Sequence, residues 1–273
     1  MKRQIIKLDR PDCQIHVEVT GEGPAIIFAH GLGGNHMSWF QQVAHFSSRY
    51  TCVTFAHRGF APSSPIAGGP DPSKYASDLA AIIGHLELSD YRIVAQSMGG
   101  WTAVEFALTK PDGLKAIVMA CTTGTIDPLQ IEAPERLRVP TWLQNEFSRS
   151  PALFARGIHP AAGERMAIEQ PAKHLLYWQI DEQNAALDRA MLAGRLMTMR
   201  QRAPEALNQI ECPILFVSGD EDVVIPPFAA DAIVRAVPRA SVVHIPSAGH
   251  STYFERPVEF NSIVEKFLAS HEP

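Results

Sequence analysis

Residues 93–101, IVAQSMGGW, place one hydroxyl side chain between an apolar run and a pair of glycines. Ser97 is a poor strand residue and an indifferent helix residue, so a turn is its simplest interpretation. Its neighbours Ala95, Gly99 and Gly100 are small, which lets the flanking backbone segments approach each other closely. The stretch therefore predicts a buried strand, a sharp turn and a helix, with the hydroxyl at the apex of the turn.

The rest of the chain alternates between strand-like and helix-like segments. The later apolar runs are nearly continuous rather than alternating, which is typical of strands buried on both faces. This alternation predicts βαβ units and an α/β fold with a mostly parallel eight-stranded sheet and helices on both faces. The strand-like runs are 4–8, 14–19, 25–31, 51–59, 92–97, 115–121, 213–220 and 241–246, and the clearest helices are 71–88, 98–111, 226–237 and 256–270.

The composition suits a globular protein with a sizeable core. The 273 residues are 46% hydrophobic and 19% charged, with a net charge of -5 and no block of like charges. This pattern argues against nucleic acid or an anionic membrane as a partner. Residues 1–19 contain no long apolar segment of the kind found in secretory signals, and no run approaches the roughly 18 apolar residues of a membrane span. We therefore expect a cytoplasmic protein.

The cysteines and short motifs give no sign of a cofactor. Cys13, Cys52, Cys121 and Cys212 each lie in or beside a strand-like run without CxxC spacing, so we expect reduced core thiols. No HExxH motif occurs, and GLGGNH at 31–36 lacks the dinucleotide pattern GxGxxG. We expect neither a metal nor a bound cofactor.

One region interrupts the alternation. From about residue 122 to 209 no strand signal occurs, and aromatic residues, methionines and alanines are frequent. A loop of this length without secondary structure would be implausible, so a helical insertion over the sheet is expected. We assign 1–124 and 208–273 to a core domain and 125–207 to a helical cap.

Reactive side chains follow three of the strand-like runs. Ser97 follows one, Asp220 and Asp222 another, and His250 comes soon after the last. Functional groups gather beyond the carboxyl ends of parallel strands. An imidazole can take the proton of a serine hydroxyl as it attacks, and a carboxylate can orient that imidazole. A Ser–Asp–His triad is therefore predicted, with either aspartate as the acid.

A glycine-rich loop follows another strand-like run, in FAHGLGGNHMSW at 28–39. Its backbone N–H groups could face an oxyanion that develops beside the serine. We expect one donor from Met98, directly after the nucleophile, and one from Leu32.

These motifs resemble those of the α/β-hydrolase fold family along nearly the whole chain. The resemblance places the insertion where that family carries its cap. Two departures occur, since Ala95 replaces the first glycine of the family's Gly-x-Ser-x-Gly turn, and Ala56 and Ala61 replace an aspartate and a glycine in a neighbouring loop. The motifs are HGLGG at 30–34, HRGFAPS at 57–63, AQSMGG at 95–100, GDEDVVIP at 219–226 and AGH at 248–250.

The resemblance also implies roles for single residues. The family spaces its acid three residues after a glycine and four before a proline, which selects Asp222, with Asp127 as a minor alternative. His30 is implied to organise the glycine-rich loop and to lie near the pocket, and Arg58 is implied to bind loop carbonyls. From the cap we name Trp142, Trp178 and Met197 as candidate pocket residues beside His30.

The serine nucleophile points to acyl transfer to water. We expect hydrolysis of a small or medium apolar ester or lactone through an acyl-enzyme. Hydrolysis of a carbon–carbon bond in a diketone or ring-cleavage product is the first alternative, with Arg156, Arg165 and Arg195 as possible carboxylate ligands. A non-catalytic ligand receptor and a cofactor-free oxidising side activity are the others. The partner is a small-molecule substrate, and a homodimer is possible.

Overall fold

The computed structural model describes residues 3–271 and contains one eight-stranded sheet with the strand order β1-β2-β4-β3-β5-β6-β7-β8. The pairs β1–β2 and β2–β4 are antiparallel, and the other five pairs are parallel. The predicted α/β class and mostly parallel sheet are thus confirmed. The strands are β1 (Arg3–Arg10), β2 (Cys13–Thr20), β3 (Ala25–Ala29), β4 (Thr51–Phe55), β5 (Tyr91–Gln96), β6 (Leu114–Ala120), β7 (Ile214–Gly219) and β8 (Ala240–Ile245).

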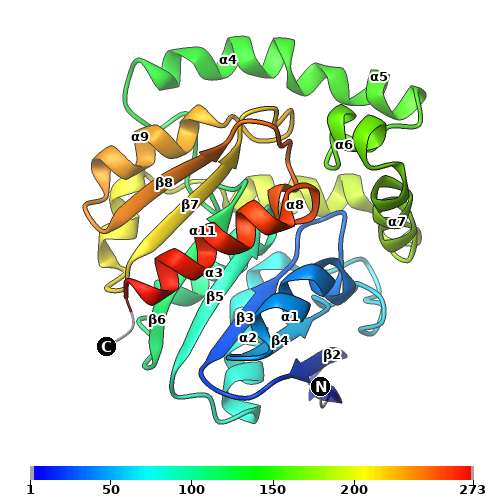
Figure 1. Cartoon of the computed structure of the whole chain (residues 1–273), viewed down its shortest axis with the longest axis vertical. Coiled ribbons are helices and arrows are strands. Elements are labelled where there is room, and N and C mark those ends of the chain that lie inside the picture. The colour runs from blue at the N-terminus through cyan, green and yellow to red at the C-terminus, as the bar shows by residue number, and fades with distance from the viewer. Residues whose placement is uncertain (1–2, 272–273) are drawn as a thin grey trace.

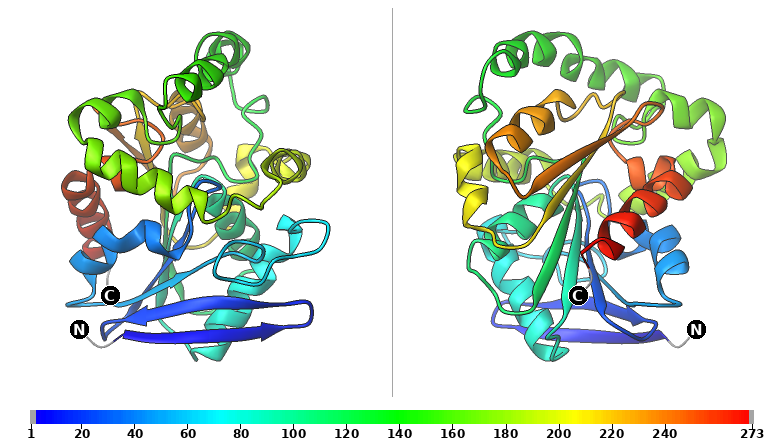
Figure 2. Two further views of the ribbon diagram at one scale, coloured as in Figure 1. Left: turned by 90° about the vertical axis from the view of Figure 1, so that its right-hand side faces the viewer. Right: turned by 60° about the vertical axis from the view of Figure 1, so that its left-hand side comes forward.

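Helices cover both faces of this sheet, as Figures 1 and 2 show. On one face α2 (Tyr75–His85), α3 (Gly99–Ala107) and α9 (Phe228–Ala236) pack their apolar residues into a core with alternate strand residues. On the other face α1 (Phe40–Phe46) and α11 (Pro257–Ala269) do the same. The continuous burial of strands such as β3 and β5 follows from this double cover.

The long insertion follows β6 and is helical. It forms an arch over the carboxyl ends of the strands, which Figure 1 shows in green at the top and right. A bridge between Ile126 and Arg202 joins the two ends of the insertion. The division into core and cap at 125 and 207 stays our proposal. The helices are α4 (Glu135–Asn145), α5 (Ser150–Ala155), α6 (Glu164–Glu169), α7 (Pro171–Glu182) and α8 (Arg189–Met199).

Short elements complete the frame around the carboxyl ends of the strands. They are the 3-10 helices η1 (His36–Trp39), η2 (Pro72–Lys74), η3 (Phe147–Arg149) and η4 (Pro204–Gln209), and the helix α10 (Thr252–Glu255). All four cysteines are free and buried. Within residues 3–271, no helix has both the length and the apolar character required to cross a bilayer.

Candidate active site

Ser97 lies on a tight turn between β5 and α3. Its φ of 48° is in the left-handed region, which is strained for a residue with a side chain. A Cβ atom on Gly99 would lie 2.2 Å from the carbonyl oxygen of Ala29, and one on Gly100 would lie 2.4 Å from Oγ1 of Thr122. Both positions therefore need glycine, and the small residues next to Ser97 have the steric reason that the sequence suggested.

Hydrogen bonds join Ser97, His250 and Asp222. Nε2 of His250 lies 2.8 Å from Oγ of Ser97, and its Nδ1 lies 2.8 Å from Oδ2 of Asp222. The other carboxylate oxygen of Asp222 accepts the N–H groups of Val224 and Ile225. A carboxylate fixed in this way favours the tautomer in which Nδ1 carries the proton, which leaves Nε2 free to accept the serine proton.

The other candidate acids lie elsewhere. Asp220 is exposed, and its Oδ1 lies 2.7 Å from Nδ1 of His244. Oδ1 of Asp127 accepts the N–H of Leu129 in a local turn. Of the three aspartates considered from the sequence, only Asp222 is bonded to His250.

A buried glutamate holds the loop that carries His250. The carboxylate of Glu255, which is 2% exposed, accepts the N–H of Gly249 at 2.8 Å and that of Ser251 at 3.0 Å. Burial raises the pKa of Glu255 to about 8, although the two amide donors oppose this shift. The sequence analysis missed this residue, for which the only signal was one acid within the otherwise apolar turn TYFE.

The backbone of the glycine-rich loop approaches the turn closely. A Cβ atom on Gly31 would lie 2.1 Å from Oε1 of Gln96 and 3.0 Å from Cβ of Ser97. The amides of Leu32 and Met98 donate no hydrogen bond to any group within residues 3–271, and Met98 directly precedes α3. Both amides are therefore available to a ligand, and their role in an oxyanion hole stays a prediction.

His30 organises this loop from within the core. It is fully buried, its Nδ1 donates to the carbonyl of Gly31 at 2.8 Å, and its Nε2 accepts the N–H of His57 at 2.9 Å. Burial lowers the pKa of His30 to about 3, so the ring is neutral. The prediction that His30 lines a substrate pocket is not supported, because both ring nitrogens are engaged inside the protein.

Arg58 is structural, but its ligands differ from those expected. Its guanidinium binds the buried carboxylate of Asp78 through two hydrogen bonds and the carboxylate of Asp12 through two more. The expectation of loop carbonyls was wrong because it took no account of acids brought near by β1, β2 and α2.

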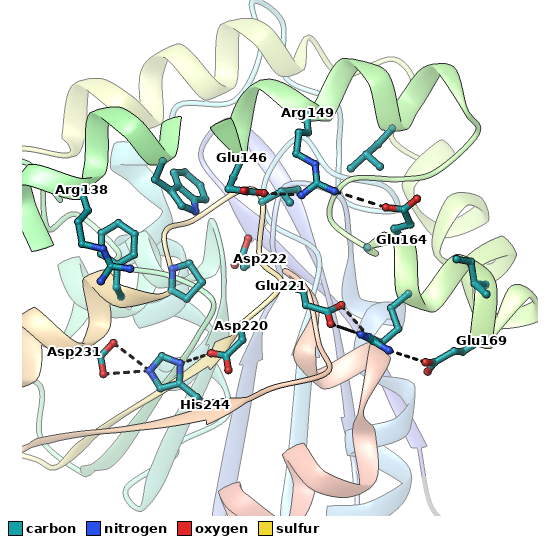
Figure 3. A pocket seen from close by; sticks show the side chains of 18 residues that line it. Arg138, Glu146, Arg149, Glu164, Glu169, Asp220, Glu221, Asp222, Asp231 and His244 are labelled. Atoms are coloured by element: carbon teal, nitrogen blue, oxygen red, sulfur yellow. Dashed lines mark hydrogen bonds and ion pairs between the residues drawn. The ribbon is translucent and has the colours of Figure 1, made fainter. Parts of the chain in front are cut away.

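The three candidate pocket residues of the cap lie away from the triad. Trp142 lines a cavity of about 920 Å³ on the outer side of the Asp222 loop, whose lining does not include Ser97 (Figure 3). Trp178 donates to the carbonyl of Gly157, and Met197 is 55% exposed. These contacts give no support to the predicted pocket roles. The outer cavity is edged by ion pairs, such as those of Arg149.

The apolar surface beside the turn comes from other residues. Met98 and Trp101 pack in one cluster with Leu192 and Leu196 of α8. Leu32 lies against the same cluster, which therefore reaches both candidate oxyanion donors. The sequence pattern could not select these residues, because the path of the insertion across the core is set by tertiary packing. Phe60, Tyr75, Ala56, Leu187 and Met199 complete this cluster, which we call the elbow cluster.

Polar contacts fasten the cap to the loops around the site. Asn184 donates to the carbonyl of Gly34 at 3.2 Å and accepts the N–H of Ala61 at 2.8 Å. The hydroxyl of Tyr177, on α7, lies 3.0 Å from Oγ of Ser251, next to His250. The glycine-rich loop and the histidine loop are thus both tied to the same part of the insertion.

The structure contains two groups of side chains with metal-ligating atoms within residues 3–271. His16, Glu18 and His36 form one, but Glu18 is already paired with Arg3. The other group consists of Cys121, Asp222 and His250. Burial raises the pKa of the Cys121 thiol well above its usual range, so the thiol stays protonated and is a poor ligand.

A family model for the α/β hydrolase fold matches residues 24–257. The chain belongs to this family. It is 27% identical over 270 residues to a protein of Mycobacterium tuberculosis named as a non-heme bromoperoxidase, covering 92% of this chain and 96% of the other. It is 26% identical over 251 residues to 3-oxoadipate enol-lactonase 2 of Acinetobacter baylyi, covering 90% and 88%.

Solved structures share this fold. A thermophilic esterase from Thermogutta terrifontis superposes with a TM-score of 0.75 at 23% identity, over the whole of both chains. The enol-lactonase from Burkholderia xenovorans superposes with a TM-score of 0.73 at 21% identity, over 95% of this chain and 98% of the other. The prediction of a hydrolase of this family is confirmed.

Proposed function

We propose that the protein is a serine hydrolase that cleaves a carboxylic ester or a lactone through an acyl-enzyme. The observation that carries this proposal is the chain of hydrogen bonds from Oγ of Ser97 through the ring of His250 to the carboxylate of Asp222. This arrangement is the one required to activate a serine hydroxyl near neutral pH.

In the first half of the reaction Oγ of Ser97 attacks the carbonyl carbon while Nε2 of His250 takes its proton. The negative charge that develops on the carbonyl oxygen is stabilised by the amides of Leu32 and Met98. His250, now an imidazolium stabilised by Asp222, returns the proton to the leaving alkoxide. The products of this half are an alcohol and an ester of Ser97.

In the second half a water molecule attacks the acyl carbon. Nε2 of His250 takes a proton from this water, and the same amides stabilise the second oxyanion. The bond to Oγ breaks, His250 returns the proton to Ser97, and the carboxylic acid leaves. A lactone follows the same steps, except that its alcohol stays attached to the acyl group.

Hydrolysis of a carbon–carbon bond is less well supported. The three arginines suggested for that reaction are engaged elsewhere. Arg156 pairs with Glu164, Arg165 pairs with Glu221, and Arg195 donates to loop carbonyls, among them that of Gly69. A non-catalytic receptor is also disfavoured, because such a protein has no need for a complete hydrogen-bonded triad.

The setting of this activity is proposed from weaker observations. The four free and buried cysteines suit a reducing compartment, so we propose the cytoplasm. A small-molecule substrate follows from the family, whereas the homodimer stays a prediction.

Rapid mixing with 4-nitrophenyl esters of increasing chain length tests the proposal. We expect a burst of nitrophenol close to one equivalent of enzyme where deacylation is slower than acylation. A panel of esters, lactones and 1,3-diketones then ranks the leaving groups. Turnover of diketones alone would replace the ester proposal with the carbon–carbon alternative.

A further inference from the structure

Arg200, at the C-terminal end of α8, has two guanidinium nitrogens without partners. Nε and Nη2 are both shielded from solvent, and neither has a hydrogen-bond partner within residues 3–271. Nη1 has only a long contact of 3.9 Å with Sδ of Met197. A buried donor without a partner is costly, and more so when it carries charge.

The vacant edge is the one that binds carboxylates elsewhere in this chain. Arg58 binds Asp78 through Nε and Nη2, at 2.6 and 2.7 Å. Arg202 binds Glu105 through the same two nitrogens, at 2.7 Å each. This edge has the two parallel donors that fit both oxygens of a carboxylate. The shape of the unfilled site therefore specifies its ligand.

The nearby groups do not fill this site. Asp127 is the acid whose charge acts on Arg200, but its carboxylate oxygens accept from Leu129 and Gln130. The carbonyls at the end of α8 favour a nearby cation, yet neither unpartnered nitrogen donates to one of them. Burial lowers the pKa of Arg200 to about 10, which still leaves the guanidinium charged near pH 7.

Arg200 lies at the far end of the elbow cluster. Its guanidinium sits 4.8 Å from the ring centroid of Trp101, four residues after Ser97. The indole N–H of Trp101 donates to the carbonyl of Leu196 at 2.9 Å, which fixes the ring. The elbow cluster also contains Met98, so an apolar surface connects the candidate oxyanion site with the guanidinium.

The geometry points to a carboxylate subsite at Arg200, which gives the hydrolase a substrate whose acyl group ends in a second carboxylate. This inference rests on the proposed function. The apolar part of the acyl chain lies along Met98 and Trp101, and the terminal carboxylate binds Nε and Nη2 of Arg200. Because this edge is closed to solvent, binding requires α8 to move slightly away from α3.

Binding is measured by calorimetry on the Ser97→Ala protein, so that no turnover is needed. The ligands are monomethyl esters of the dicarboxylic acids from succinate to suberate, each paired with the methyl ester of a monocarboxylic acid of equal length. We expect one chain length for which the acid binds roughly 10- to 100-fold more tightly than its neutral partner, as two charge-assisted hydrogen bonds imply.

Substitutions then assign this preference to Arg200. Arg200→Met in the Ser97→Ala protein should remove the preference, and Arg200→Lys should restore only part of it, because an ammonium cannot form the fork. Arg156→Met is the control, since Arg156 is exposed and paired with Glu164. An unchanged preference in Arg200→Met, or equal binding of acid and neutral esters at every length, would overturn the inference.

Kinetics separate this inference from the proposed function. With active serine, the ratio of kcat/KM for the half-ester to that for the neutral ester should fall in Arg200→Met and stay unchanged in Arg156→Met. A protein that binds the half-esters through Arg200 but hydrolyses no ester retains the subsite and refutes the proposed function. A protein that hydrolyses both esters with the same kcat/KM refutes the subsite alone.

Discussion

Nδ1 of His250 lies 2.8 Å from Oδ2 of Asp222, and both side chains are buried, whereas Asp220 is exposed and bonded to His244 instead. The two aspartates are only two residues apart, yet the loop after β7 turns them in different directions. Figure 3 shows Asp220 beside His244 at the wall of the outer cavity. The geometry thus gives each carboxylate its own histidine.

This separation predicts unequal effects of two matched substitutions. Asp222→Asn should lower kcat by about 10⁴-fold, because the amide favours the wrong tautomer of His250. Asp220→Asn should lower kcat by less than about tenfold, because that side chain is bonded to His244 at the surface. Steady-state kinetics with one ester, together with melting temperatures, measure both effects. A larger loss in Asp220→Asn would show that the wrong acid was assigned.

A second prediction concerns the close approach of the glycine-rich loop. Gly31→Ala should lower kcat at least about tenfold, since the added Cβ overlaps Oε1 of Gln96, whose amide nitrogen donates to the carbonyl of His250. Gly84→Ala is the control, because nothing lies within 4 Å of its Cβ position on α2. It should keep full activity and gain about 0.5–1 kcal/mol of stability. Equal activity in both variants would contradict the proposed packing.

A third prediction concerns the attachment of the insertion. Asn184→Ala leaves the N–H of Ala61 and the carbonyl of Gly34 without a partner, which should cost about 1–3 kcal/mol of stability. Amide hydrogen exchange in α7 should accelerate relative to the sheet. Asn208→Ala is the matched control, since Asn208 is exposed and makes one bond, to the carbonyl of Ala236. If exchange in α7 stays unchanged in Asn184→Ala, the side chain does not anchor the insertion.

A fourth prediction follows from the buried Glu255. Its pKa of about 8 lies above the usual value of 4.5, so between these values the folded protein binds a proton that the unfolded chain has released. Its contribution to the free energy of unfolding therefore falls as pH rises, by about 1.4 kcal/mol per pH unit. Glu255→Gln removes this dependence.

Denaturant unfolding between pH 5.5 and 7 measures this effect as the difference between the parent protein and the variant. Glu259→Gln, an exposed substitution on α11, is the control and should leave the slope unchanged. A Glu255→Gln protein with the same slope as the parent would mean that Glu255 is ionised throughout this range.

The sequence predicted the parts of this molecule that depend on local pattern. The continuous apolar runs around Ile93 and Leu215 indicated strands buried on both faces, and the small residues beside Ser97 indicated the sharp turn. The spacing between Gly219 and Pro226, read through the family resemblance, favoured Asp222. In each case the deciding information lies within a few neighbouring residues.

The sequence could not predict contacts made by the path of the insertion. Trp142 and Met197 have the composition of pocket residues, yet the fold places one beside the outer cavity and exposes the other. Trp101 and Leu196 meet only because α8 crosses α3. Glu255 resembles any acid of an amphipathic segment until two amides are seen to point at its carboxylate. Tertiary packing decides these positions.

The central claim is that Ser97 is the nucleophile, and a fluorophosphonate probe tests it most directly. Mass spectrometry of the treated protein should show one adduct, on the peptide that contains Ser97, and the Ser97→Ala protein should remain unlabelled. An adduct on another residue, or equal labelling of the Ser97→Ala protein, would contradict the account.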